Sequence, residues 1–169
     1  ALKLAAQFPD QVDALINLSP NIRINDPAAF LLNDPWGKQI ATAMIGPIRR
    51  VKVTHPDYPT YWDTAYTVNA LVELEELVES SMQSETFTQV KQASLTLYYY
   101  KSEEEQDPVV RVDKILWMQE NLGGDADWQL AQALPSVGNH VLASPIKSLD
   151  PQATAQAALE FVHRLKSRP

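Results

Sequence analysis

Two residues of types used in proton-transfer chemistry follow predicted strands in the C-terminal half of the chain. Asp107 comes after the β-former-rich segment Ser94–Tyr100, and His140 comes after residues 128–134. In open α/β sheets, functional groups gather at the carboxyl ends of the strands, so the two side chains can meet there. An aspartate so placed would hold the tautomer of a histidine base and stabilise the imidazolium that forms.

Each residue also has a simpler interpretation when it is taken alone. An Asp-Pro pair such as Asp107-Pro108 is a frequent helix cap or turn, and a histidine beside Gly138-Asn139 is usually a turn residue. Val109 and Val110 follow directly and are poor helix residues, which argues against a helix beginning at Asp107. The pairing of Asp107 with His140 is therefore a hypothesis that rests on the order of the two loops that follow the predicted strands.

No complete active-site motif of a common type is present. The five glycines stand at positions 37, 46, 123, 124 and 138, and no two have the spacing of a G-x-S-x-G elbow, a G-x-G-x-x-G turn or a P-loop. The three histidines cannot form an H-E-x-x-H zinc helix. Without cysteine the chain has no disulfide, no thiolate nucleophile and no thiolate metal site.

Composition indicates one globular domain. The chain has 169 residues, of which 45% are hydrophobic and 21% charged. Its formal net charge is −7, which argues against nucleic acid or an anionic membrane as the main partner. No run of apolar residues approaches the roughly 18 needed for a membrane-spanning helix.

Helix and strand patterns alternate along the chain, which predicts an α/β fold with a parallel sheet covered on both faces. Three strands are too few for such a sheet, so we expect further strands to come from sequence upstream. The predicted order is a helix at 1–8, a strand at 14–18, helices at 27–33, 35–45 and 60–82, a strand at 94–100, a helix at 111–122, a strand at 128–134 and a helix at 151–166.

The opening of the chain also predicts a longer protein. Ala1–Phe8 contains good helix formers with no N-cap before them, no initiator methionine and no signal peptide. We therefore expect this chain to be the C-terminal part of something longer. The alternative is a small domain whose first helix lacks a cap.

Several of these segments together resemble the C-terminal half of an α/β-hydrolase. Asp107-Pro-Val-Val-Arg-Val-Asp113 precedes a predicted helix, and Gly138-Asn-His140-Val-Leu142 precedes the last one. The opening segment, residues 1–20, is similar to the helix after the nucleophile elbow and the sixth strand of that family. The resemblance implies strands six to eight, with the acid after strand seven and the histidine after strand eight.

The resemblance implies three parts. Residues 1–25 are the helix and strand after an absent nucleophile elbow, 26–90 a helical lid insertion, and 91–169 the C-terminal α/β part with the acid and histidine loops. Residues 26–90 carry seven of the fourteen aromatic residues and no strand signal. We expect an apolar substrate pocket above the histidine; its proposed lining is Phe30, Trp36, Trp62 and Tyr66. Aromatic residues at helical spacing are otherwise ordinary core.

The implied function is a serine hydrolase for a carboxylic ester or similar small acyl substrate, without metal or organic cofactor. His140 matches the base and Asp107 the acid, with Glu105 as an alternative because three glutamates and no glycine precede Asp107. The serine would lie upstream, so this chain alone is expected to be inactive and to need the missing N-terminal half as its partner. Ser19 lacks the flanking glycines of an elbow. The alternatives are a non-catalytic binding or regulatory protein of the same fold and an independent helical interaction domain.

Overall fold

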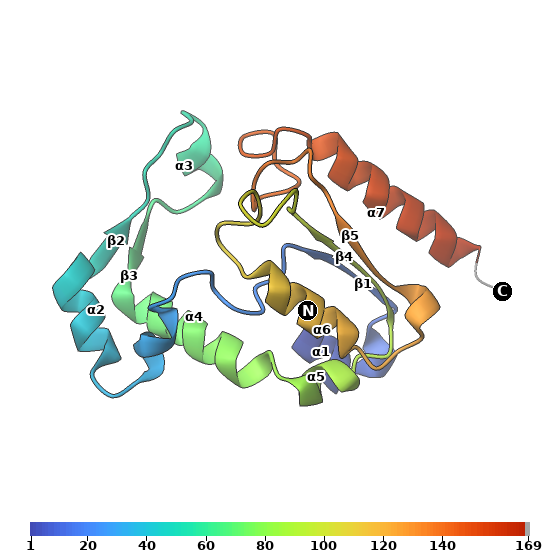
Figure 1. The fold of residues 1–169 in the computed structure, drawn as a ribbon, viewed down its shortest axis with the longest axis horizontal. Helices are drawn as coiled ribbons and strands as arrows, with labels where there is room; N and C mark the ends of the chain where they lie inside the picture. The colour runs from blue at the N-terminus through green and yellow to red at the C-terminus, as the bar shows by residue number, and fades with distance from the viewer. Residues whose placement is uncertain (168–169) are drawn as a thin grey trace.

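A three-stranded parallel sheet lies at the centre of the computed structural model, which describes residues 1–167 (Figure 1). The strands are β1 (Ala14–Leu18), β4 (Ala93–Tyr98) and β5 (Gln129–Ala133), in the order β1-β4-β5. Both pairings are parallel, with β4 in the middle. The α/β class and the parallel sheet predicted from the alternating pattern are therefore confirmed.

Helices cover both faces of this sheet (Figure 1). On one face lie α1 (Leu2–Gln7), α5 (Ser84–Thr88) and α6 (Val112–Glu120), and on the other lies α7 (Pro151–Lys166). All six residues of β4 are buried, as expected for a central strand enclosed on both sides.

Two hydrophobic clusters follow from the alternation of side chains along β4. Tyr98 packs with α1, α5 and α6, where Phe87 and Ile115 are fully buried. Leu95 and Leu97 point to the opposite face and pack against α7. The helix α7 begins where the sequence places it, because the Asp150 side chain accepts a hydrogen bond from the Ala153 N–H and Pro151 occupies the first helical position.

The segment between β1 and β4 contains most of the remaining elements and extends to one side of the sheet (Figure 1). Its elements are the 3₁₀ helix η2 (Ala29–Asn33), α2 (Gly37–Ile45), β2 (Ile48–Arg50), α3 (Tyr58–Tyr61), β3 (Ala65–Thr67) and α4 (Val68–Ser81). Two further 3₁₀ turns, η1 (Pro9–Gln11) and η3 (Ala126–Trp128), precede β1 and β5.

Two expectations for this segment are wrong. It contains strands, because β2 and β3 pair antiparallel, with Arg49 opposite Tyr66. The long helix begins at Val68 rather than Thr60, since Thr67 supplies the N-cap by accepting a hydrogen bond from the Ala70 N–H. Three-residue strands with mostly exposed side chains carry no hydrophobic alternation, so sequence alone could not reveal them.

The strand β1 is an edge strand in the part of the chain that the structure describes. Its backbone pairs with β4 on one side, and its Ile16 and Leu18 side chains are each 41% exposed. No helix within residues 1–167 combines the length and hydrophobicity needed to cross a membrane.

Candidate active site

A closed loop returns Asp107 to the end of β4. The Asp107 N–H donates to the Tyr99 carbonyl at 3.1 Å, although the two residues are eight positions apart in the sequence. Between them the chain folds on itself: Tyr100 pairs with Gln106, and the Lys101 N–H donates to the Glu105 carbonyl. The three glutamates, Glu103 to Glu105, therefore lie in a loop that projects from the sheet, and Asp107 is still placed at the carboxyl end of β4.

Backbone N–H groups fix the Asp107 side chain. Its Oδ1 accepts hydrogen bonds from Val109 N–H at 2.9 Å and Val110 N–H at 3.1 Å, and the side chain is 0% exposed. Burial raises the pKa of Asp107, but the hydrogen bonds from His140, Val109 and Val110 outweigh it and hold the pKa below its usual 3.8. Ionised Asp107 therefore contributes stability above its ordinary pKa, and this contribution is lost as pH falls through the lowered pKa of the folded state.

A tight turn after β5 presents His140. Gly138 has a φ of 61°, a left-handed backbone conformation that favours glycine. Asn139 then accepts a hydrogen bond from the Val141 N–H through its side chain. Leu142 is buried, and its carbonyl accepts a hydrogen bond from the Thr154 hydroxyl of α7. The turn is thus anchored on both sides of His140, whose side chain stays 27% exposed.

The structure brings Asp107 and His140 together. The Asp107 Oδ2 lies 2.8 Å from the His140 Nδ1. Because the ionised carboxylate can only accept, Nδ1 carries the proton and Nε2 is left as the basic nitrogen. Glu105, the alternative acid, pairs with Lys101 instead.

Asn25 is a supporting residue that the sequence did not reveal. Its N–H donates to the Val109 carbonyl at 2.8 Å, and its side-chain amide lies 3.4 Å from the Asp107 carbonyl. One residue earlier, Ile24 forms an antiparallel bridge with Val110. The chain leaving β1 is thus tied to the acid turn. No local pattern could show this, since the paired residues are more than 80 positions apart.

Ser19 lies at the same edge of the sheet but does not present a nucleophile. It follows β1 with a φ of 41° and is only 4% exposed. Its hydroxyl is buried and has no hydrogen-bond partner among residues 1–167. A nucleophile elbow must expose its serine oxygen, so the geometry agrees with leaving Ser19 out of the site.

The four residues proposed for the substrate pocket do not share one cavity. Trp62 lines a cavity of about 570 Å³ together with Tyr61 and residues 143–146, which follow His140. Phe30 lines a different cavity, beside Arg23 and Glu75. Trp36 is 71% exposed, and Tyr66 in β3 donates its hydroxyl to the Asp63 carbonyl. The substrate-pocket role of these residues stays a prediction, and the structure supports it at Trp62, whose cavity includes the loop after His140.

The tip formed by α3 contacts the loop after His140. The Lys147 Nζ lies 4.7 Å from the centre of the Tyr58 ring, a cation–π contact. Tyr58 in turn stacks on Trp62, with 5.2 Å between ring centres. Within the described residues no group of three or more histidine, cysteine, aspartate or glutamate side chains could hold a metal ion.

Comparison with solved structures finds a similar fold in two hydrolases. A structure from the work on LipS and LipT, two metagenome-derived lipolytic enzymes, matches with a TM-score of 0.66 and 15% identity, covering 96% of this chain and 60% of that one. The crystal structure of E-2-(acetamidomethylene)succinate hydrolase matches with a TM-score of 0.53 and 12% identity, covering 96% and 62%. No protein-family model and no curated protein sequence matches the chain.

The chain thus spans about three fifths of the length of the structures it resembles. At these identities the likeness concerns the fold. Together with the parallel sheet and the helices on both of its faces, it confirms the expected resemblance: over the part that it spans, this chain has the α/β-hydrolase fold.

Proposed function

We propose that this chain carries the acid and the base of a serine hydrolase that cleaves a carboxylic ester or a similar small acyl compound. The observation that carries the proposal is the 2.8 Å hydrogen bond between Asp107 Oδ2 and His140 Nδ1 at neighbouring strand ends. The burial and ionised state of the acid and the partial exposure of the imidazole support assigning them as an orienting group and a general base.

The proposed reaction passes through an acyl-enzyme. A serine oxygen attacks the carbonyl carbon, and its proton passes to His140 Nε2. The tetrahedral intermediate then expels the alcohol, which takes that proton. A water molecule attacks the acyl-serine ester, again giving a proton to Nε2, and the carboxylic acid leaves as the serine oxygen regains its proton. Asp107 stays ionised throughout and stabilises the imidazolium. None of these steps requires a metal or an organic cofactor.

We propose that the nucleophile and the oxyanion-hole donors belong to an N-terminal half of the same protein outside this chain. Ser19 is buried, and the chain spans only about three fifths of its structural neighbours. The open edge of β1, with Ile16 and Leu18 half exposed, is suited to a further parallel strand. That strand would lead into the nucleophile turn beside His140.

Activity-based labelling tests this division of the site. The 169-residue chain is expected to resist a fluorophosphonate probe and to hydrolyse no ester, because it presents no activated serine. The complete protein is expected to be labelled on an upstream serine. Peptide mapping by mass spectrometry locates the label.

The matched control is Ser19→Ala in the complete protein, which should be labelled as strongly as the unmodified protein. A label mapped to any serine within residues 1–169 would overturn the division. A complete protein that is folded but never labelled would favour a non-catalytic binding protein of the same fold.

We further propose that the segment 26–90 is a lid whose α3 tip roofs the acyl pocket. The contact between Tyr58 and Lys147 and the cavity shared by Trp62 and residues 143–146 support this placement. Most of that lining is aromatic or apolar, with Asp57 and Ser144 as its polar members, and residues 143–146 follow the base closely in the chain, so apolar acyl groups should be preferred over negatively charged ones.

Replacing Trp62 with alanine should change the chain-length preference of the complete enzyme. The indole lines the cavity wall, so its removal gives room for a longer acyl chain. The measurement is kcat/KM for p-nitrophenyl esters of increasing acyl length. The labelling of the serine should stay intact, because the indole takes no part in proton transfer.

Trp36→Ala provides the control, since Trp36 is largely exposed and does not line the Trp62 cavity. It should leave the chain-length profile unchanged. A uniform change for every ester in Trp62→Ala would count against the lid.

A further inference from the structure

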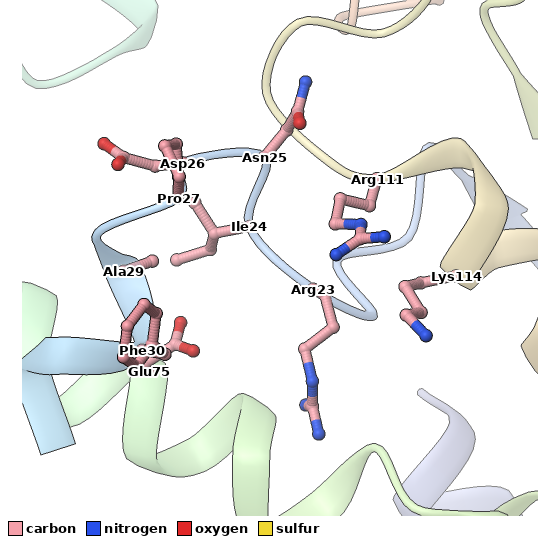
Figure 2. A pocket seen from close by; sticks show the side chains of 10 residues that line it. All are labelled: Arg23, Ile24, Asn25, Asp26, Pro27, Ala29, Phe30, Glu75, Arg111 and Lys114. Carbon is pink, nitrogen blue, oxygen red and sulfur yellow. The ribbon is translucent and has the colours of Figure 1, made fainter. Parts of the chain in front are cut away.

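A second cavity, of about 480 Å³, lies between the chain leaving β1 and the helices η2, α4 and α6 (Figure 2). Neither Asp107 nor His140 lines it. Its charged side chains come from three parts of the fold: Arg23 and Asp26 after β1, Glu75 in α4, and Arg111 and Lys114 at the start of α6. Ile24 and Phe30 supply much of its apolar wall.

The two signs of charge occupy opposite sides of this cavity. Figure 2 shows Arg111 and Lys114 on one side and Glu75 beside Phe30 on the other, with Arg23 reaching down between them. Arg111 is already held by Asp113, through two hydrogen bonds of 2.9 and 2.7 Å. The charge available to a ligand therefore comes mainly from Arg23 and Lys114.

Arg23 retains donors for a negatively charged group. Its Nη1 lies 3.3 Å from the Ile22 carbonyl and 3.4 Å from the Val78 carbonyl, and both acceptors are neutral. A guanidinium has five N–H donors, so these contacts leave most of them unused. Its charge partly offsets the effect of burial, which raises the pKa of Glu75, yet no ion pair joins the two side chains in the described part of the chain.

Glu75 is the unsatisfied group in the cavity. The residue is only 4% exposed, and its Oε2 is buried without a hydrogen-bond partner among residues 1–167. Burial raises the pKa of Glu75, Arg23 opposes this, and Glu79 adds to the increase. A buried carboxylate without a donor is costly, and a bound cationic donor group would satisfy it.

We infer that this cavity binds a small zwitterion, namely an α-amino acid with an apolar side chain. Its carboxylate would face Arg23 and Lys114, its ammonium group would face Glu75, and its side chain would lie against Ile24 and Phe30. A molecule of this kind bridges the gap between Arg23 and Glu75, and the volume lies within the range of small-molecule sites. The site is separate from the proposed hydrolytic centre.

Isothermal titration calorimetry on the full-length protein tests the inference with L-phenylalanine and L-leucine as probes. We expect at least one of them to bind. For phenylalanine the comparison compounds are 3-phenylpropanoate, which lacks the ammonium group, and 2-phenylethylamine, which lacks the carboxylate. Each should bind at least tenfold more weakly, because each satisfies only one side of the cavity.

Glu75→Gln and Arg23→Gln should each weaken the binding of the amino acid at least tenfold. Glu75→Gln keeps the shape of the side chain and removes a buried charge, so the fold should be retained, which circular dichroism checks. The matched control is Glu76→Gln, an exposed position one residue along the same helix and outside the cavity, which should bind normally.

His140→Ala should also bind the amino acid normally, so failure of the proposed hydrolase and failure of this site give different results. Absence of binding by both amino acids would overturn the inference. So would equal binding of 3-phenylpropanoate, which would indicate a simple anion site, or unchanged binding in Glu75→Gln.

Discussion

Replacing His140 with alanine in the complete enzyme is expected to lower kcat by several orders of magnitude, up to about 10⁶-fold. His140 Nε2 would accept the proton of the serine and return it to the leaving alcohol, so both halves of the reaction depend on it. The hydrogen bond between His140 Nδ1 and Asp107 keeps the imidazole proton on Nδ1, so Nε2 is free to accept the proton of the serine. The measurement is steady-state hydrolysis of a p-nitrophenyl ester, with fluorophosphonate labelling as a second readout.

The chain offers matched controls in its two other histidines. His163 is exposed on α7, and the His55 Nδ1 lies 3.9 Å from Asp57 in an exposed turn. Replacing either with alanine should change kcat less than about threefold. The mechanism is wrong if folded His140→Ala keeps more than a tenth of the activity, or if His163→Ala loses as much.

Asp107→Asn is expected to lower kcat by roughly 10⁴-fold while preserving the fold. The asparagine oxygen can still accept the Val109 and Val110 N–H groups, so the turn should survive. Its amide nitrogen, placed where Oδ2 now meets His140, can only donate. It would force the imidazole proton onto Nε2, the nitrogen that must be free to accept one.

Glu105→Gln provides the matched comparison, because it removes the other candidate carboxylate by the same chemical change. Glu105 is paired with Lys101, so its replacement should leave kcat within about threefold of the original. A large loss in Glu105→Gln together with a small one in Asp107→Asn would assign the acid role to Glu105. Thermal unfolding of both variants shows whether any loss of activity reflects a loss of structure.

Local sequence was sufficient for the elements that carry their own signals. The strand at 14–18 was predicted from a short apolar run between turn residues, and the helix at 151–166 from Asp150-Pro151 and its apolar face. Both have the predicted bounds. The approximate places of Asp107 and His140 followed in the same way, because each lies on a loop after a strand.

Elements that depend on partners were less predictable. The strands β2 and β3 are stabilised by pairing with each other, and because their residues are mostly exposed, they show no alternation of hydrophobic and polar residues in the sequence. The capping of α4 by Thr67 rather than Thr60 depended on which threonine is free to cap, because Thr60 lies within the short helix α3. The local sequence around Thr60 and Thr67, with its prolines and threonines, is compatible with a helix that begins after either threonine.

By itself, the sequence determined the α/β class, the order of the main elements and the two loops that carry an acid and a base. Only the tertiary structure decided which carboxylate meets His140. Asp107 and Glu105 are two residues apart, and no local preference separates them. Asp107 faces the imidazole because the loop returns it to Tyr99 and because the N–H groups of Val109 and Val110, fixed by the strand-like pairing with residues 23–25, hold its other oxygen. Such contacts join distant segments, so they exist only after the chain has folded.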